Sequence, residues 1–167
     1  MMDTINIINT GGTFNKDYDE INGKLIVNKT NKYIKQIINK SKIHNINIKG
    51  MIYKDSLDIT NDDRQKLLNY IQKTKIKKII IVHGTDTIDK TALFLAKYIK
   101  NKTIILTGAM KPFSIDPVEA TSNLMSAYGF LQNDTKNDVY ICMHGIIKKY
   151  TKIKKNKKLG IFEINDS

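Results

Sequence analysis

Short apolar runs alternate along this chain with longer segments whose apolar residues recur at helical spacing, and this alternation limits the fold more than any other feature. The apolar runs predict strands at residues 4–9, 46–53, 78–82, 103–107 and 138–143. Parallel strands need long crossover connections, which are usually helices, so this order is typical of a parallel sheet. We therefore predict an α/β fold: a three-layer αβα domain with a mostly parallel, flavodoxin-like sheet.

Helices are predicted between these strands, at residues 31–40, after Thr60, at 88–100 and at 117–132. The hydroxyl of Thr60 is suited to cap the second of these helices, and Asp62 and Asp63 place negative charge in its first turn. Pro117 is suited to the start of the last helix, because its fixed φ matches the first helical position.

The 167 residues, of which 41% are hydrophobic, are enough for one domain with a buried core. No apolar run is long enough to cross a bilayer, and the start of the chain lacks a secretory signal. We therefore expect a cytoplasmic protein without a membrane partner. The single cysteine, Cys142, lies in an apolar run and is expected to pack in the core.

The net charge of +12 is carried almost entirely by lysine, since Arg64 is the one arginine among 28 basic residues. Arginine is favoured where phosphate and guanine are recognised, so this composition does not predict a nucleic-acid partner. Enrichment in lysine, isoleucine and asparagine is what an AT-rich genome produces. The exception is a dense group of lysines at positions 148, 149, 152, 154, 155, 157 and 158.

Glycines and polar residues follow four of the predicted strands. These turns read TGGT at residues 10–13, DSLD at 55–58, HGTDT at 83–87 and GAMKP at 108–112. In open parallel sheets, ligands bind beyond the carboxyl ends of the strands. Threonine beside glycine in two of these turns places a hydroxyl where the backbone can approach a ligand closely, which favours nucleophilic chemistry.

Other ligand classes lack their motifs in this sequence. Neither the dinucleotide-binding nor the P-loop glycine pattern occurs. Residues 17–23 resemble a calcium loop only superficially, because Ile21 and Asn22 replace a ligand and the turn glycine. The three histidines are scattered and no CxxC pair is present. We expect no metal and no organic cofactor.

The four turns, together with Asn123 and Leu124, resemble the amino-terminal domain of the bacterial-type L-asparaginase/glutaminase family in order and spacing. The resemblance covers nearly the whole chain. It implies that residues 1–167 are an amino-terminal-type domain and that the family's carboxyl-terminal domain is absent.

The resemblance implies that Thr10 attacks the substrate amide, and that Thr85, Asp86 and a lysine form a second threonine cluster that assists proton transfer. Tyr18, in a mobile loop over residues 14–23, would orient or activate Thr10. Lys155 is the preferred lysine, because it lies ahead of Gly160, Ile161 and Phe162 in a pattern similar to the family's, and Lys152 is the alternative. The lysines could also simply form a solvated loop.

The resemblance also implies the substrate-binding residues Gly11, Ser56, Leu57, Gly84, Thr85 and Asp86. Ser56 would hold the α-carboxylate, Asp86 would pair with the ammonium, and backbone amides near Gly11 and Thr85 would form an oxyanion site. Leu57 departs from the family, in which a polar residue follows the serine, so one substrate contact is lost or the preferred substrate differs.

Four neighbouring residues are expected to have simpler roles. Thr13 and Thr87 are expected to cap turns or helices, and Asp58 to cap the helix after the second strand rather than contact substrate. His83 is expected to be a buried, hydrogen-bonded support for its turn rather than a general base.

The family completes its active site with an acid from the second domain of a neighbouring subunit. A homodimer or higher homo-oligomer could supply this acid instead, with Glu20, Glu119 and Glu163 as candidates.

The resemblance thus implies an amidohydrolase that releases ammonia from L-asparagine, or a related small β-amide, through a threonine acyl-enzyme. The alternative is a catalytically weak amino-acid-binding module that depends on a partner. A third and weaker hypothesis is RNA association through the lysines of residues 148–158.

Overall fold

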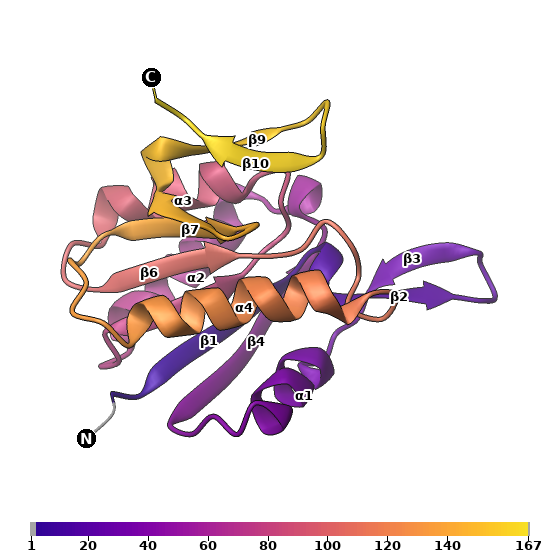
Figure 1. Ribbon diagram of the computed structural model, residues 1–167, viewed down its shortest axis with the longest axis horizontal. Helices are drawn as coiled ribbons and strands as arrows, with labels where there is room; N and C mark the ends of the chain where they lie inside the picture. Colours follow the sequence, from indigo (N-terminus) through magenta and orange to yellow (C-terminus); the bar gives the residue numbers. More distant parts are fainter. Residues whose placement is uncertain (1–2, 167) are drawn as a thin grey trace.

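A computed structural model describes residues 3–166. Its central sheet has six strands in the order β4-β1-β5-β6-β7-β8, of which the first five are parallel and β8 runs antiparallel to β7 (Figure 1). Counting only the parallel strands along the chain, this is the 2-1-3-4-5 order of flavodoxin-like sheets. The predicted fold class is confirmed. The strands are β1 (Ile5–Gly11), β4 (Ile46–Lys54), β5 (Lys78–Val82), β6 (Thr103–Thr107), β7 (Val139–Met143) and β8 (Ile146–Lys149).

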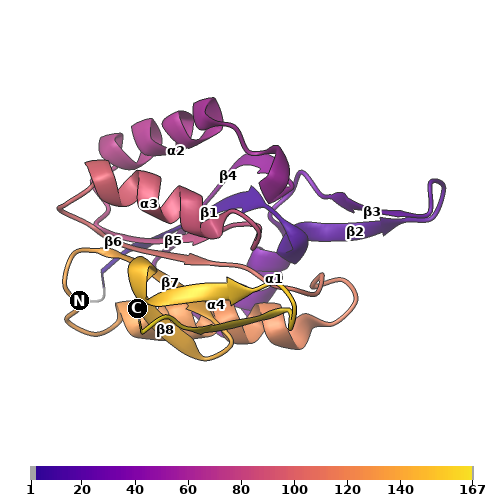
Figure 2. The ribbon, with the colours of Figure 1, turned by 90° about the horizontal axis from the view of Figure 1, so that it is seen from above.

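Helices cover both faces of the sheet. Helices α2 and α3 lie side by side on one face, and α1 and α4 lie on the other (Figure 2). Their bounds are α1 (Lys32–Lys40), α2 (Asn61–Lys73), α3 (Ile88–Tyr98) and α4 (Pro117–Leu131). Each start agrees with its prediction to within one residue, and the predicted ends of α1, α3 and α4 agree to within two, where helix ends commonly fray.

The alternation of side chains along the strands separates two hydrophobic cores. In β5, Ile79 and Ile81 pack toward α2 and α3, whereas Ile80 and Val82 pack toward α1 and α4. A strand buried on both faces reads as a continuous apolar run, which is why these strands are recognisable in the sequence. Cys142 lies fully buried in the second core, as expected, and burial raises the pKa of its thiol to about 12.

Two local signals set the starts of α2 and α4 as predicted. The Thr60 hydroxyl accepts from the Asp63 amide while the Asp63 carboxylate accepts from the Thr60 amide, so the pair forms a reciprocal capping box. Pro117 occupies the first turn of α4, and the Asp116 side chain caps it.

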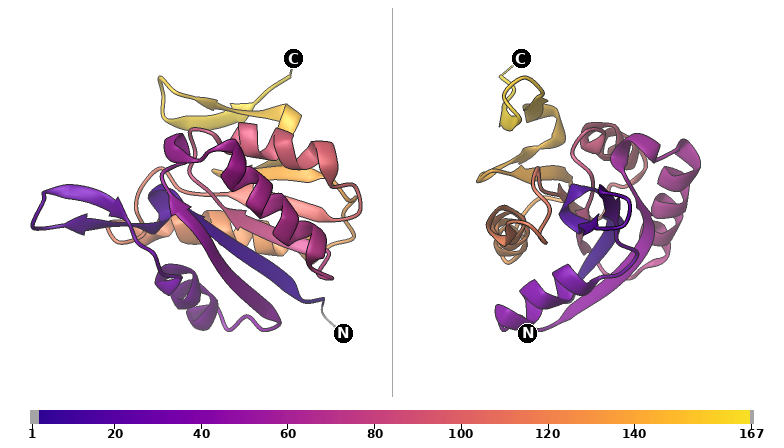
Figure 3. Two further views of the ribbon diagram at one scale, coloured as in Figure 1. Left: turned by 180° about the vertical axis from the view of Figure 1, so that it is seen from behind. Right: turned by 90° about the vertical axis from the view of Figure 1, so that its right-hand side faces the viewer.

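Two antiparallel hairpins stand apart from the sheet. One pairs β2 (Lys16–Asp19) with β3 (Lys24–Val27) and projects away from the body of the domain (Figure 1). The other pairs β9 (Ile153–Asn156) with β10 (Ile161–Ile164) and lies beside α3 (Figure 3). From the sequence, the first segment is predicted to be a mobile loop and the second a lysine-rich stretch. The two hairpins and β8 are therefore not predicted from the sequence and are seen only in the structure.

The lysine-rich segment is therefore not simply a solvated loop. Ile153 and Phe162 are buried in the first core and anchor the hairpin, Lys154 points outward, and Lys155 lies on the same side as Ile153 and is largely buried. Among residues 3–166, no helix is long and apolar enough to cross a membrane.

Candidate active site

The turns that follow β1, β4 and β5 stack directly on one another. A Cβ added to Gly12, whose φ is +74°, would lie 2.4 Å from the Gly84 Cα, and a Cβ added to Gly84 would lie 2.5 Å from the Ser56 Cβ. No side chain fits at either contact, so glycine is required at both positions. The stacking brings the turns of Thr10, Ser56 and Thr85 to one edge of the sheet.

Thr10 is the next-to-last residue of β1, whose residues are all buried. Its side chain has no exposed surface, and its Oγ1 donates a hydrogen bond of 2.8 Å to the Val82 carbonyl oxygen. The next amide, that of Gly11, donates to Asn9 Oδ1 over 3.0 Å. In this conformation the Thr10 hydroxyl is held by the neighbouring strand β5.

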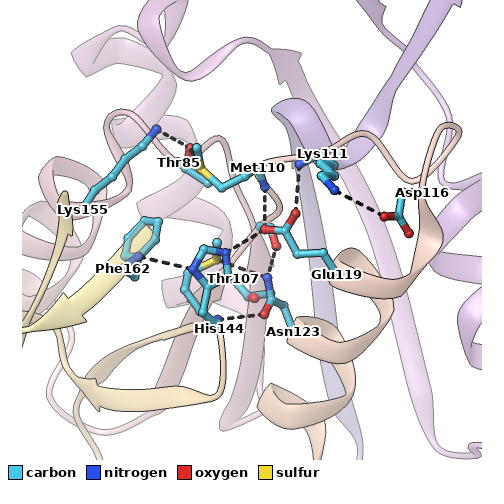
Figure 4. A network of polar contacts seen from close by, with 12 residues as sticks. Thr85, Thr107, Met110, Lys111, Asp116, Glu119, Asn123, His144, Lys155 and Phe162 are labelled. Carbon is cyan, nitrogen blue, oxygen red and sulfur yellow. Dashed lines mark hydrogen bonds and ion pairs between the residues drawn. The ribbon is translucent and has the colours of Figure 1, made fainter. Parts of the chain in front are cut away.

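Lys155 joins the second threonine cluster across the fold. Its Nζ lies 2.8 Å from Thr85 Oγ1 and 2.8 Å from Asp86 Oδ1 (Figure 4 shows the contact with Thr85). The Lys155 side chain is only 13% exposed. Its backbone lies on β9, so the contact joins residues 69 and 70 positions apart in the chain. Lys152 instead lies in the short helical turn before β9 and is exposed.

Ser56 is held between the β4 and β5 turns. Its Oγ accepts from the Asp86 amide over 3.2 Å, and its carbonyl oxygen accepts from Thr87 Oγ1 over 2.8 Å. Leu57 beside it is 72% exposed. The predicted substrate-binding residues Gly11, Ser56, Gly84, Thr85 and Asp86 therefore belong to one group of adjoining turns.

Tyr18 is not brought into this group. It lies on β2 of the projecting hairpin, opposite Leu25, and is 59% exposed. Figure 1 shows this hairpin extending away from the sheet.

Asp58, Thr87 and Thr13 do not make the capping hydrogen bonds expected of them. Asp55 rather than Asp58 caps the short helical turn that follows β4, and Thr60 caps α2, because these residues precede the free amides at each start. Thr87 is the residue before α3, but its hydroxyl donates to Ser56 and makes no cap bond. Gly12, not Thr13, is the cap position of the turn after β1.

A second network, not predicted from the sequence, supports the β6 turn and the Lys155 hairpin (Figure 4). The Glu119 carboxylate accepts from the amides of Met110 and Lys111 and from His144 Nε2, over 2.8, 3.0 and 2.9 Å. His144 Nδ1 in turn accepts from the Phe162 amide, and Phe162 is the strand partner of Lys155. Met110 Sδ lies 3.4 Å from Thr85 Oγ1. The sequence shows that Met110 belongs to the GAMKP turn, but it does not show this contact with Thr85.

His83 is buried and supports its own turn, as expected from the sequence. Its Nδ1 lies 2.7 Å from the Gly84 carbonyl oxygen and its Nε2 lies 2.8 Å from Thr91 Oγ1. A carbonyl can only accept, so Nδ1 carries the proton and Nε2 accepts from Thr91. Burial lowers the pKa of His83 from 6.5 to about 4.

Within the described part of the chain, no group of three or more His, Cys, Asp or Glu side chains is arranged to hold a metal ion.

Similarity to known proteins identifies the family. Residues 4–162 match the family model described as Asparaginase, N-terminal, and the chain belongs to this family. The family suggested by the turn motifs is confirmed.

Individual relatives fit the same assignment. The chain is 30% identical over 83 residues to a glutamyl-tRNA(Gln) amidotransferase subunit of Methanopyrus kandleri, covering 48% of this chain and 18% of the relative. It is 35% identical over 69 residues to the glutaminase-asparaginase of Acinetobacter glutaminasificans, covering 40% and 21%. The solved structure of a probable cytoplasmic L-asparaginase from Campylobacter jejuni matches with a TM-score of 0.83 and 26% identity, covering 98% of this chain and 53% of that chain. This chain thus spans about half the length of the solved relative.

The lowered pKa of His83 predicts a loss of stability in acid. The unfolded chain binds a proton at His83 near pH 6.5 and the folded chain only near pH 4. The free energy of unfolding should therefore fall as pH drops below 6.5, by about 1.4 kcal/mol per pH unit and about 3 kcal/mol in all. Urea unfolding of wild type and His83→Gln between pH 7 and 4 measures this, and the difference between the two proteins isolates His83 from the carboxylates. A difference that does not change with pH would contradict the assignment.

Proposed function

We propose that this chain is an amidohydrolase that releases ammonia from L-asparagine, or a related small β-amide, through an acyl-enzyme on Thr10. The observation that carries this proposal is the contact of Lys155 with both Thr85 and Asp86, beside the turn that holds Thr10. A lysine 13% exposed and bonded to a threonine hydroxyl is the arrangement that proton transfer at a hydroxyl or a bound water requires.

The reaction has two halves. Thr10 Oγ1 attacks the side-chain amide carbon, its proton passes to the departing nitrogen, the carbon–nitrogen bond breaks, and ammonia leaves an ester on Thr10. Water then attacks the ester, aspartate is released and the Thr10 hydroxyl is restored. Lys155 and Thr85 serve as the route for the proton of the attacking water, because Lys155 Nζ already contacts the Thr85 hydroxyl.

Substrate orientation follows from the adjoining turns. The Asp86 carboxylate, whose side chain is 39% exposed, would pair with the substrate ammonium, and Ser56 with the α-carboxylate. The Gly11 and Thr85 amides would face the developing oxyanion. For attack, Thr10 Oγ1 must leave the Val82 carbonyl, and Tyr18 must swing in with its hairpin to contact Thr10.

The second candidate is an amino-acid-binding module that depends on a partner for turnover. Two observations favour it: Thr10 is buried and bonded to Val82, and Tyr18 lies outward on its hairpin. One relative is also named as a subunit of an amidotransferase. Binding of asparagine without release of ammonia would favour this candidate.

We also propose a homo-oligomer in which a second copy supplies the acid that completes the site. Glu119 is engaged by the Met110 and Lys111 amides and His144, and Glu163 by Asn156 and Lys154. Glu20 lies exposed in the turn of the projecting β2–β3 hairpin, where it can reach a neighbouring molecule. Glu20 is therefore the candidate we favour.

Removal of either threonine hydroxyl should abolish turnover. Thr10→Ala and Thr85→Ala are each expected to lower ammonia release from L-asparagine by about a thousandfold or more, since they remove the nucleophile and the proton route. Thr151→Ala, which removes an exposed threonine hydroxyl, is the matched control and should retain activity. An active Thr10→Ala variant would rule out the acyl-enzyme.

The neighbouring lysines provide a second test. Lys155→Met should lower kcat by about a hundredfold, a typical contribution of a positioned proton-transfer group. Lys154→Met, one position earlier and paired with Glu163 on the outer side, and Lys152→Met should remain near wild type. Equal losses in all three variants would indicate that the charge of the segment matters and not the Lys155 contact.

Complementation tests the shared site. Thr10→Ala and Glu20→Gln are each expected to be inactive, but mixed oligomers contain sites that combine an intact Thr10 with the partner's intact Glu20. Mixing the two variants after brief unfolding and refolding should therefore restore ammonia release. A fully active monomer in sedimentation analysis would contradict the proposal.

A further inference from the structure

A cavity opens on the outer side of α2 and α3. It adjoins the space lined by Thr85, Asp86 and Lys155, with which it shares Lys90, Leu93 and Tyr150. Its volume is about 510 Å³, within the usual range for small-molecule sites. Figure 3 shows α2 and α3 side by side on this face, with the β9–β10 hairpin next to α3. Arg64, Lys90, Lys97 and Lys100 line the cavity together with apolar Leu93 and Phe94. No Asp or Glu of the described residues lines it.

Arg64, the one arginine of the chain, is a buried residue of the cavity lining. It is only 7% exposed. Its Nε donates to Thr91 Oγ1 over 3.0 Å, and its Nη1 donates to the Ile59 carbonyl oxygen and to Asn61 Oδ1 over 3.2 and 3.3 Å. All of these acceptors are neutral. The bonds fix the plane of the guanidinium.

The remaining nitrogen of Arg64, Nη2, takes no part in these hydrogen bonds, which are the ones that the Arg64 side chain makes among residues 3–166. Among residues 3–166, the fully buried side-chain nitrogen and oxygen atoms that lack a hydrogen-bond partner are Asn15 Oδ1 and Thr135 Oγ1. Arg64 Nη2 is not one of them. Nη2 is therefore not fully enclosed, and Arg64 is one of the residues that line the cavity. A fixed guanidinium with one nitrogen left without a protein hydrogen bond is suited to bind a carboxylate or phosphate oxyanion.

The positive charge of this site is not neutralised by a close carboxylate. No ion pair within 4 Å joins Arg64 to an Asp or Glu of the described chain. The neighbouring Asp63 is already bonded to Lys54 and Thr60, and Asp89 acts on Arg64 only from a distance. Burial lowers the pKa of Arg64, which reflects the cost of keeping this charge out of water. A bound anion would offset that cost.

The apolar wall adds a second requirement for the ligand. Leu93 is 59% exposed, and Phe94 and the ring of Tyr150 border the same space. We propose that this cavity binds a small organic anion, a carboxylate or phosphate ester whose acidic group meets Arg64 and whose flat apolar group lies on Leu93 and Phe94.

The same guanidinium is linked to the candidate active site. From Arg64 Nε the hydrogen bonds continue through Thr91 Oγ1 to His83 Nε2, and from His83 Nδ1 to the Gly84 carbonyl oxygen. Every residue in this chain of bonds is buried. This chain of hydrogen bonds connects Arg64 to Gly84, in the turn that carries Thr85 and Asp86, so we expect an anion bound at Arg64 to perturb Gly84. The binding site itself does not depend on the proposed function, and its test measures binding and not turnover.

Titration of the full chain with phenyl phosphate, phenylacetate, inorganic phosphate and benzyl alcohol tests the site. We expect saturable binding of the first two by calorimetry, weaker binding of inorganic phosphate, which lacks the apolar group, and none of uncharged benzyl alcohol. The stronger of the first two identifies the acidic group that the site prefers. In an amide NMR spectrum, the signals of Leu93, Phe94 and Gly84 should shift on binding.

Matched variants separate this site from general attraction by a basic protein. Arg64→Lys should weaken binding about tenfold, because lysine lacks the planar fork. Lys90→Gln combined with Lys97→Gln should also weaken it, whereas Lys66→Gln combined with Lys73→Gln removes the same charge from exposed positions of α2 and should not. If Arg64→Lys does not fold, as judged by circular dichroism, the comparison of the two lysine pairs decides.

Two results would overturn the binding site: no saturable binding, or equal weakening of binding by both lysine pairs. Binding without a shift of the Gly84 signal would overturn the link between the site and the turn of Thr85 and Asp86.

Discussion

The direct stacking of Gly12 on Gly84 and of Gly84 on Ser56 is the contact on which the candidate active site depends. Each glycine lies where an added Cβ would come within 2.5 Å of a neighbouring backbone or side-chain carbon. Because the strands β4, β1 and β5 are parallel neighbours, their carboxyl ends meet at one edge and bring these turns together. The turns that carry Thr10 and Thr85 therefore lie in direct contact through Gly12 and Gly84.

The segment that follows the antiparallel strand β8 supplies the lysine of the candidate site, Lys155. After β7 the chain turns back through Gly145, pairs as β8, and continues into the β9–β10 hairpin. Burial of Ile153 and Phe162 anchors this hairpin to the core. The Phe162 amide also donates to His144, and Phe162 lies opposite Lys155 in the hairpin, so this bond fixes the hairpin next to Lys155. The contact of Lys155 with Thr85 and Asp86 is thus a product of the hydrophobic anchoring of a lysine-rich segment.

Prediction from the sequence succeeds where the signal is local. Continuous apolar runs identify the doubly covered strands, and Thr60 and Pro117 mark the starts of α2 and α4. The hairpins are missed because the four lysines of residues 153–158 also fit an exposed stretch, and because residues 14–23 also fit a loop. Asp58 is expected to cap a helix, yet Asp55 and Thr60 do so, because small shifts of an element's start change which side chain reaches the free amides.

The sequence by itself determined the family, the order of elements and the turns in which the candidate site residues lie, because these follow from period, glycine placement and motif spacing. Only the tertiary structure decided which lysine meets Thr85, that Thr10 is bonded to Val82, and that Tyr18 lies on a hairpin directed outward. It also decided that the lone Arg64 is buried against neutral acceptors and lines a cavity. These are contacts between residues far apart in the chain, and they depend on how whole elements pack, which local patterns do not encode.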